Sequence, residues 1–400
     1  MKPKIKPKNW MIYFILIPFL HPRGFDEYFY IYKFFFTSWL YLSLIIIAGL
    51  FLYGLSKKRA KVDIFASLIL LYYLTMAVIT FTIRHTFSGG LQKIFAAPLL
   101  CIFCIYSCKR FPKRFIECVN NLLFIILFLN AVIFSPLFWK AYFAPISNHL
   151  TFLGHVQINA QLATVSILMA YVGYSLFDCN KKKFMVQVIL AFMTLMTSFT
   201  SASYIVILLL SFCWFLYRVE KINKLFEFDG KTFVLIYIAI NLFLFWFIAN
   251  IDVAINIGAF SLNGRGFIWK EAISSFFRHP FSGYGVQGVL IKVFWSFWVG
   301  DGQGMNYMHN QLLQVLNDGG IILCVFFLMM LMAAASGISK LKKTRLRYWV
   351  SVFLMILLII MIFESALDYF YGYIILSTIA NLPGIASAVN VRKGGNIWVS

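Results

Sequence analysis

The residues best suited to chemistry lie in one polar stretch, residues 251–309, between two long apolar runs. After Arg265, apolar side chains recur at helical spacing, which predicts an amphipathic helix in the membrane interface that ends near Arg278. A helix dipole favours a cation at the C-terminal end, and this effect alone could account for Arg278. The same dipole disfavours a cation near the N-terminal end, so an anionic partner explains Arg265 better.

A histidine follows where the chain returns to an apolar run. His309 stands beside a stripe of amide side chains on the predicted helix, formed by Asn306, Asn310, Gln314 and Asn317. Such a stripe is costly in lipid unless it faces protein or a water-filled cavity. A histidine that is neutral near pH 7 could accept a proton from a hydroxyl nucleophile, and a structural role fits its position equally well.

Further charged residues stand near the ends of other apolar runs. Arg84 could bind an anion, or its charge could simply reach the membrane surface while its stem stays in lipid. Glu364 and Asp368 are carboxylates near the end of a predicted span, where ionisable groups are either functional or paired. We predict that their partners are the arginines on the same side of the membrane. A structural ion pair at the helix end is the alternative.

The elements that must position these residues follow from the composition. The 400-residue chain is 62% hydrophobic and 12% charged, with a mean hydropathy of +0.83. Soluble domains have about a quarter charged residues, so this is a membrane protein. Its apolar runs are continuous, which excludes a β-barrel, whose strands alternate. We predict an all-α polytopic fold, one membrane domain over residues 1–400, with residues 251–309 as its large extracytoplasmic loop.

About twelve apolar runs are long enough, or nearly so, to cross a hydrocarbon core of roughly 30 Å. They cover residues 10–20, 34–55, 62–83, 91–107, 115–134, 158–177, 184–200, 204–217, 232–250, 310–335, 348–366 and 370–391. The first run is short but lacks the small-residue cleavage site of a signal peptide, so we interpret it as a retained anchor.

The basic residues predict the orientation. The chain has 35 Lys and Arg against 14 Asp and Glu, a formal net charge of +21. Most of the cations fall in alternate loops, and the positive-inside rule places these loops and both termini in the cytoplasm. This distribution explains the charge without nucleic acid as a partner. The stretch 251–309 contains no nucleotide-binding loop and no metal-binding Asp-x-Asp, so we expect neither a metal nor another cofactor.

Three motifs, in a fixed order, resemble those of a known protein family. They are Gly-Arg-x-x-x-Trp at 264–269, His-Pro-x-x-Gly-Tyr-Gly at 279–285, and His-Asn-x-x-Leu followed by Gly-Gly at 309–320. Together with the spans and the long loop, they resemble the superfamily of O-antigen polymerases (Wzy type) and O-antigen ligases. One departure concerns the turn at 201–204, where many members carry an arginine and this chain reads Ser-Ala-Ser-Tyr. The role of that arginine is absent here or is filled elsewhere.

The resemblance implies a GT-C-like fold in the bacterial inner membrane, with the active site facing the periplasm. It implies an oligosaccharide donor linked to undecaprenyl pyrophosphate and a metal-independent glycosyl transfer. Membrane lipid surrounds such an enzyme, and a flippase and a chain-length regulator are its expected partners. By the same resemblance, Arg265 matches a pyrophosphate-binding arginine and His309 an essential loop histidine.

We therefore expect Arg265 to bind the departing pyrophosphate and His309 to position or deprotonate the acceptor hydroxyl. The residues expected to bind pyrophosphate or glycan are Arg84, Arg278, Lys270, Trp269, Tyr284, Asn310 and Glu364. The compact loop motifs favour a polymerase, which extends a lipid-linked repeat unit. The alternative is a ligase, which transfers the glycan to lipid A core. A transporter or flippase would also explain many spans, but the sequence lacks paired broken helices in matching halves.

Overall fold

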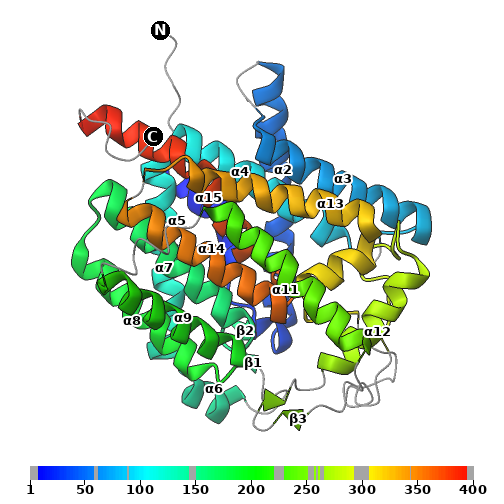
Figure 1. Ribbon diagram of the computed structural model, residues 1–400. Coiled ribbons are helices and arrows are strands. Elements are labelled where there is room, and N and C mark those ends of the chain that lie inside the picture. Colours follow the sequence, from blue (N-terminus) through cyan, green and yellow to red (C-terminus); the bar gives the residue numbers. More distant parts are fainter. Residues whose placement is uncertain are drawn as a thin grey trace.

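The computed structural model describes residues 8–57, 62–87, 90–143, 150–219, 229–250, 256–257, 260–261, 265–291, 306–342 and 344–393. Over these residues the fold is almost entirely helical (Figure 1). The α-helices are α1 (Asn9–Leu20), α2 (Tyr30–Ser56), α3 (Ile64–Arg84), α4 (Leu91–Arg110), α5 (Pro112–Phe128), α6 (Pro136–Phe143), α7 (Ile158–Phe177), α8 (Lys181–Thr197), α9 (Ser201–Arg218), α11 (Gly230–Asn250), α12 (Arg265–Arg278), α13 (Gln311–Ser339), α14 (Arg345–Phe363) and α15 (Phe370–Lys393).

Short elements join these helices. The 3-10 turns η1 (Gly24–Glu27) and η4 (Ala366–Asp368) follow α1 and α14, and the π-helical η2 (Leu129–Ile133) extends α5. Two small antiparallel ribbons pair β1 (Leu150–Thr151) with β2 (Gly154–His155) and β3 (Asn256–Ile257) with β4 (Phe260–Ser261).

The all-α membrane architecture predicted from the sequence is confirmed. In the described part of the chain, ten helices are long and apolar enough to cross a membrane: α2, α3, α4, α5 with η2, α7, α9, α11, α13, α14 and α15. The other two predicted spans are also helices but are shorter, since α1 has 12 residues and α8 has 17. α1 stops at His21-Pro22, where proline removes a helix donor and the chain turns into η1. α8 opens on three lysines, which shortens its apolar part.

The centre of the bundle is formed by α7 and α15. α15 packs against α4, α13 and α7, while α7 also contacts α5, α8 and α14 (Figure 1). Small residues allow this close packing, as membrane helices without a hydrophobic driving force require. A side chain at Gly173 of α7 would come within 2.8 Å of the amide nitrogen of Asn120. The carbonyl of Met169 accepts a hydrogen bond from that same amide at 2.9 Å, which ties α5 to α7.

The segment after α12 folds back onto a break in α13. Gly319 and Gly320 leave helical geometry, and Gly320 has φ +63°, in the left-handed region that favours glycine. The break frees backbone groups that the segment 279–288 uses. Ile321 N–H donates to the carbonyl of Pro280 at 2.8 Å, and Gly285 N–H donates to that of Asp318 at 2.9 Å. The Gly-Gly pair therefore holds the loop against the first turns of α13.

These contacts define one end of the bundle, here called the site end. It contains the C-terminal ends of α3 and α14, the N-terminal ends of α4, α13 and α15, and helix α12, and it lies toward the lower right of Figure 1. Val286 N–H donates to Thr80 Oγ1 of α3 at 3.0 Å, so the segment after α12 contacts α3 as well as α13.

Candidate active site

Glu364 joins the two residues that the sequence singled out for catalysis. Its Oε1 lies 2.6 Å from Nη2 of Arg265, and its Oε2 lies 3.1 Å from Nδ1 of His309. The carboxylate is 1% exposed, whereas the Arg265 and His309 side chains are 16% and 14% exposed. The buried carboxylate therefore holds a cation and an imidazole side by side, each partly accessible.

The local backbone explains why Glu364 points inward. α14 ends at Phe363, and Glu364 adopts an extended conformation with φ −146°. Its N–H still donates to the carbonyl of Ile360 at 2.8 Å, which closes the last helical turn. The next N–H, of Ser365, donates to the hydroxyl of Tyr307 at 3.1 Å. The chain is thus fixed on both sides of the carboxylate.

Tyr307 completes the cluster. Its hydroxyl donates to Oε2 of Glu364 at 3.2 Å, and its ring meets that of His309 edge-on at 4.5 Å between centroids. Burial and the neighbouring carboxylate of Glu364 raise the pKa of Tyr307 well above 10. The hydroxyl therefore stays protonated and remains a donor to the carboxylate.

Asn310 holds His309 in place. It is the N-cap of α13, with Oδ1 accepting from Leu313 N–H at 2.9 Å, and its Nδ2 donates to Asn241 Oδ1 of α11 at 2.8 Å and to the Ile362 carbonyl of α14 at 3.0 Å. The side chain is 0% exposed. The amide thus joins three helices beside His309, and a contact of Asn310 with substrate stays a prediction.

The amide stripe of α13 faces protein. Gln314 accepts from Met308 N–H at 3.0 Å and donates to Asp318 at 3.0 Å. Asn317 donates to the Ala272 carbonyl of α12 at 3.1 Å. The stripe therefore docks α12 and the 306–310 segment onto α13 rather than lining open space.

Trp269 and Tyr284 also bind protein groups. Trp269 is 1% exposed, and its indole N–H donates to the Met308 carbonyl at 3.0 Å. The Tyr284 hydroxyl donates to the Ser275 carbonyl at 3.0 Å. These two hydrogen bonds attach α12 to its neighbouring segments, and contact of either residue with substrate stays a prediction.

The two exposed cations of α12 lie apart from the cluster. Arg278 ends the helix 13 residues after Arg265, which at 1.5 Å per residue is about 20 Å away. Its side chain is 66% exposed and lies 3.8 Å from Glu271. Lys270 is exposed on the same helix. The structure therefore does not bring Arg278 together with Arg265, and a role of Arg278 or Lys270 in substrate binding stays a prediction.

A second charged cluster lies near the first. Lys93 of α4 lies 2.5 Å from Asp368 Oδ1 and 3.6 Å from Asp318 Oδ2. Asp368 was predicted to pair with an arginine, and its partner is this lysine. Arg84 donates to the Val286 carbonyl at 2.6 Å and supports the folded-back segment. No local sequence pattern predicts this cluster, because Lys93, Asp318 and Asp368 belong to three elements that are distant in the chain.

A comparison with known families bears on this geometry. Residues 186–328 match the O-antigen ligase family. A search of curated proteins finds no significant match to the chain. The matched segment runs from α8 into α13 and contains Arg265 and His309, so the resemblance predicted from the motifs is confirmed over this part of the chain. The match supports the class of O-antigen ligases and polymerases without separating the two.

Glu364 lies outside the segment matched to the O-antigen ligase family, 36 residues beyond its last residue, 328. The pair with Arg265 spans 99 positions of sequence. In the sequence, only the position of Glu364 at the end of an apolar run marked this residue as unusual. The turn at 201–204 also departs from the family pattern, and here Thr200 caps α9 by accepting from Ser203 N–H at 3.3 Å.

The arrangement has a definite chemical capacity. An ionised Glu364 accepts from Nδ1–H of His309, which leaves the lone pair on Nε2 to accept a proton. Within the described residues, Nε2 has no hydrogen-bond partner. The Arg265 guanidinium has five N–H donors and uses one on Glu364, so others can meet an anion. A base and an anion-binding group thus stand on either side of one carboxylate.

Proposed function

We propose that this protein is a surface-polysaccharide polymerase that transfers a glycan from undecaprenyl pyrophosphate onto a lipid-linked repeat unit. The observation that carries the proposal is the joint contact of Glu364 with Arg265 and His309. A lipid pyrophosphate is already a good leaving group, so catalysis needs chiefly placement, a base and a cation. This cluster supplies the base and the cation.

In the proposed reaction, Nε2 of His309 takes the proton of an acceptor hydroxyl. The hydroxyl oxygen attacks the anomeric carbon of the donor sugar from the face opposite the pyrophosphate. The bond from that carbon to the pyrophosphate oxygen breaks, and the configuration inverts. Arg265 binds the charge that develops on the departing pyrophosphate, since guanidinium matches phosphate oxygens in bidentate fashion. The proton on His309 is then released to solvent or product.

The compact motifs at 279–285 and 309–320 favour a polymerase over a ligase. The ligase is retained as a second candidate because the matched family carries that description. Both reactions use the same donor and differ in the acceptor, which is a lipid-linked repeat unit for the polymerase and lipid A core for the ligase.

The proposed location is the bacterial inner membrane, with the site end facing the periplasm. The distribution of cations supports this orientation. Lys109 and Arg110 end α4 and Arg218 ends α9, at the helix ends opposite the site end. The positive-inside rule assigns such clusters to the cytoplasm. A flippase and a chain-length regulator remain the proposed partners.

The test is a gene deletion in the native host, complemented with the wild type or with His309→Asn. Asparagine suits the variant because His309 has φ +49°, a left-handed conformation that asparagine tolerates. His85→Asn is the matched control, since His85 is exposed and has φ +53°. On a polysaccharide gel, lipid A core with a single repeat, restored to a ladder by wild type and His85→Asn only, supports the polymerase.

Other gel patterns lead elsewhere. Bare lipid A core with long chains retained on undecaprenyl pyrophosphate identifies the ligase. An unchanged polysaccharide in the deletion strain rejects both reactions. If His309→Asn restores the ladder, the histidine is not required for the reaction.

A further inference from the structure

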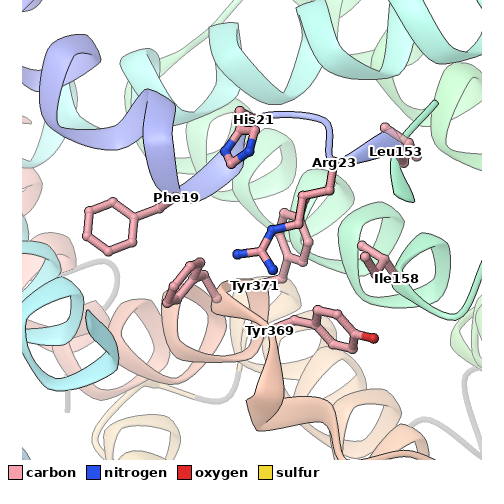
Figure 2. Close-up of a pocket in the computed structure, with 8 residues that line it drawn as sticks. Phe19, His21, Arg23, Leu153, Ile158, Tyr369 and Tyr371 are labelled. Carbon is pink, nitrogen blue, oxygen red and sulfur yellow. The ribbon is translucent and has the colours of Figure 1, made fainter. Parts of the chain in front are cut away.

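A small pocket lies beside the Glu364 cluster at the site end. It is small and partly open to the surroundings, and it lies between the end of α1, the start of α7 and the start of α15. Its walls include Phe19, Tyr369 and Tyr371, and two nitrogen-bearing side chains, His21 and Arg23, reach it from the chain after α1 (Figure 2). The residues of the catalytic cluster do not line it, so the pocket is a separate feature.

Arg23 is the unusual member of the pocket. Figure 2 shows its guanidinium at the centre of the lining residues, and its carbon Cζ lies 5.8 Å from the ring centroid of Phe370. Among the described residues, no carboxylate lies within ion-pair distance of this guanidinium. The neighbouring Asp26 instead faces His21, with Oδ1 3.7 Å from Nε2. A partly buried cation without an anionic partner is costly, unless a ligand supplies the charge.

The backbone holds Arg23 firmly in this position. Arg23 N–H donates to the Leu153 carbonyl at 3.2 Å, and Gly24 N–H donates to the Phe152 carbonyl at 2.9 Å. A side chain at Gly24 would come within 2.2 Å of the Thr151 carbonyl oxygen, so only glycine permits this approach. The β1–β2 ribbon therefore fixes the backbone from which the Arg23 side chain enters the pocket.

Two chain segments connect the pocket with the catalytic cluster. Gln157 Nε2 lies 3.4 Å from Nδ1 of His309, and the next residue, Ile158, lines the pocket. In the second segment, which joins α14 to α15, Tyr369 lines the pocket five residues after Glu364. The residue that contacts His309 and a residue that lines the pocket are therefore neighbours in the chain. His309 contacts Oε2 of Glu364, and Arg265 contacts Oε1 of the same carboxylate.

The lining chemistry defines the kind of ligand. Guanidinium binds carboxylate or phosphate, and aromatic walls suit the apolar faces of a sugar ring. Ile158 begins α7, and the partial positive charge of a helix N-terminus adds to the preference for an anion.

We propose that this pocket binds an anionic group, a carboxylate or a phosphate, of the acceptor glycan next to the sugar whose hydroxyl faces His309. The inference rests on the proposed function in naming an acceptor, and it adds a specificity site to it. Arg265 takes the donor pyrophosphate on one flank of Glu364, and Arg23 takes the acceptor on the flank beyond His309. The pocket would thus select acceptors by their charge.

The first experiment measures binding without catalysis. The purified full-length protein is titrated with glucuronate and with glucose 1-phosphate, and the rise in unfolding temperature is recorded for wild type, Arg23→Gln, Arg265→Gln and Arg278→Gln. We expect at least one probe to stabilise wild type, Arg265→Gln and Arg278→Gln, and we expect Arg23→Gln to weaken its apparent affinity about tenfold or more. The probe that acts distinguishes carboxylate from phosphate.

Two results would overturn the proposal: no stabilisation by either probe, or stabilisation lost in Arg265→Gln but kept in Arg23→Gln. Arg23→Lys guards against misfolding, because it keeps the charge and should retain part of the affinity. In a transfer assay with separate donor and acceptor, Arg23→Gln should raise the acceptor KM and leave the donor KM unchanged. If Arg23→Gln loses probe binding while His309→Asn still transfers glycan, the pocket stands and the proposed mechanism fails.

Discussion

At the scale of single residues, the carboxylate of Glu364 organises the site. It contacts Arg265, His309 and Tyr307, although it is 1% exposed and comes from the end of a different helix. A carboxylate that orients an imidazole through Nδ1 and leaves Nε2 free is the arrangement used by Ser-His-Asp enzymes on unrelated folds. Here the same carboxylate also contacts the guanidinium that we propose binds the leaving group.

The bidentate role of Arg265 leads to a first prediction. Arg265→Lys retains the charge beside Glu364 but loses the planar fork that matches a pyrophosphate. We expect glycan transfer to fall by about tenfold or more while the unfolding temperature changes little, because a lysine can still pair with the carboxylate. Transfer is measured with a polyprenyl-pyrophosphate-linked donor, and Arg278→Lys is the control. Full activity in Arg265→Lys would rule out bidentate binding.

Glu364→Gln tests the shared carboxylate. The amide cannot serve as an anionic acceptor for both the guanidinium and the imidazole, so both groups lose their alignment. We expect transfer to drop by roughly a hundredfold or more, with the protein still inserted and folded. The rate is compared with that of Glu271→Gln, which changes a carboxylate on α12 whose side chain is 45% exposed. An equal effect of the two substitutions would contradict an organising role for Glu364.

The cluster around Lys93 concerns stability rather than chemistry. Lys93→Met leaves Asp318, 3% exposed, and Asp368, 14% exposed, without their cation. Breaking a buried pair on one side costs about 3–5 kcal/mol, so unfolding should begin at clearly lower temperature or denaturant concentration. Lys270→Met, on the exposed face of α12, is the matched control and should be nearly neutral. If the two variants unfold alike, the Lys93 cluster does not stabilise the fold.

At the scale of elements, the sequence predicted the helices well and their docking poorly. The predicted spans are all helices, and the amphipathic helix predicted after Arg265 is α12, because the period of apolar residues is a local signal. The pair between Arg265 and Glu364 is separated by 99 positions and leaves no local pattern. For the same reason, the sequence could not predict the hydrogen bonds that Asn310, Trp269 and Tyr284 make with other segments of the chain.

The break in α13 at Gly320 leads to a prediction about the segment that docks there. At Gly320 an added Cβ would lie 2.3 Å from the backbone of Phe281, and the positive φ adds strain. Gly320→Ala should therefore displace the segment 279–288 and reduce transfer strongly. Gly49→Ala is the control, since no atom lies within 4 Å of its added Cβ and alanine favours a helix interior by about 1 kcal/mol. Normal transfer in Gly320→Ala would mean that the docked loop is not required.

At the scale of the whole molecule, the distribution of charge and the location of the site both indicate how the protein is oriented in the membrane. The site end carries Arg265, His309 and the pocket around Arg23, while Lys181–Lys183 and Arg218 lie at helix ends opposite to it. If the positive-inside rule governs this chain, substrate chemistry and cationic loops face different compartments. Both lipid-linked substrates would then meet the enzyme on the side away from the cytoplasm.

Cysteine labelling checks this orientation directly. In a variant whose native cysteines are replaced, Lys270→Cys on α12 and Lys182→Cys at the start of α8 each give one exposed thiol. A membrane-impermeant maleimide applied to intact spheroplasts should label the position on α12 and should reach the position on α8 only after permeabilisation. The reverse pattern would place the Glu364 cluster in the cytoplasm, where transfer between periplasmic lipid-linked glycans could not occur, and the polymerase and ligase proposals would both fall.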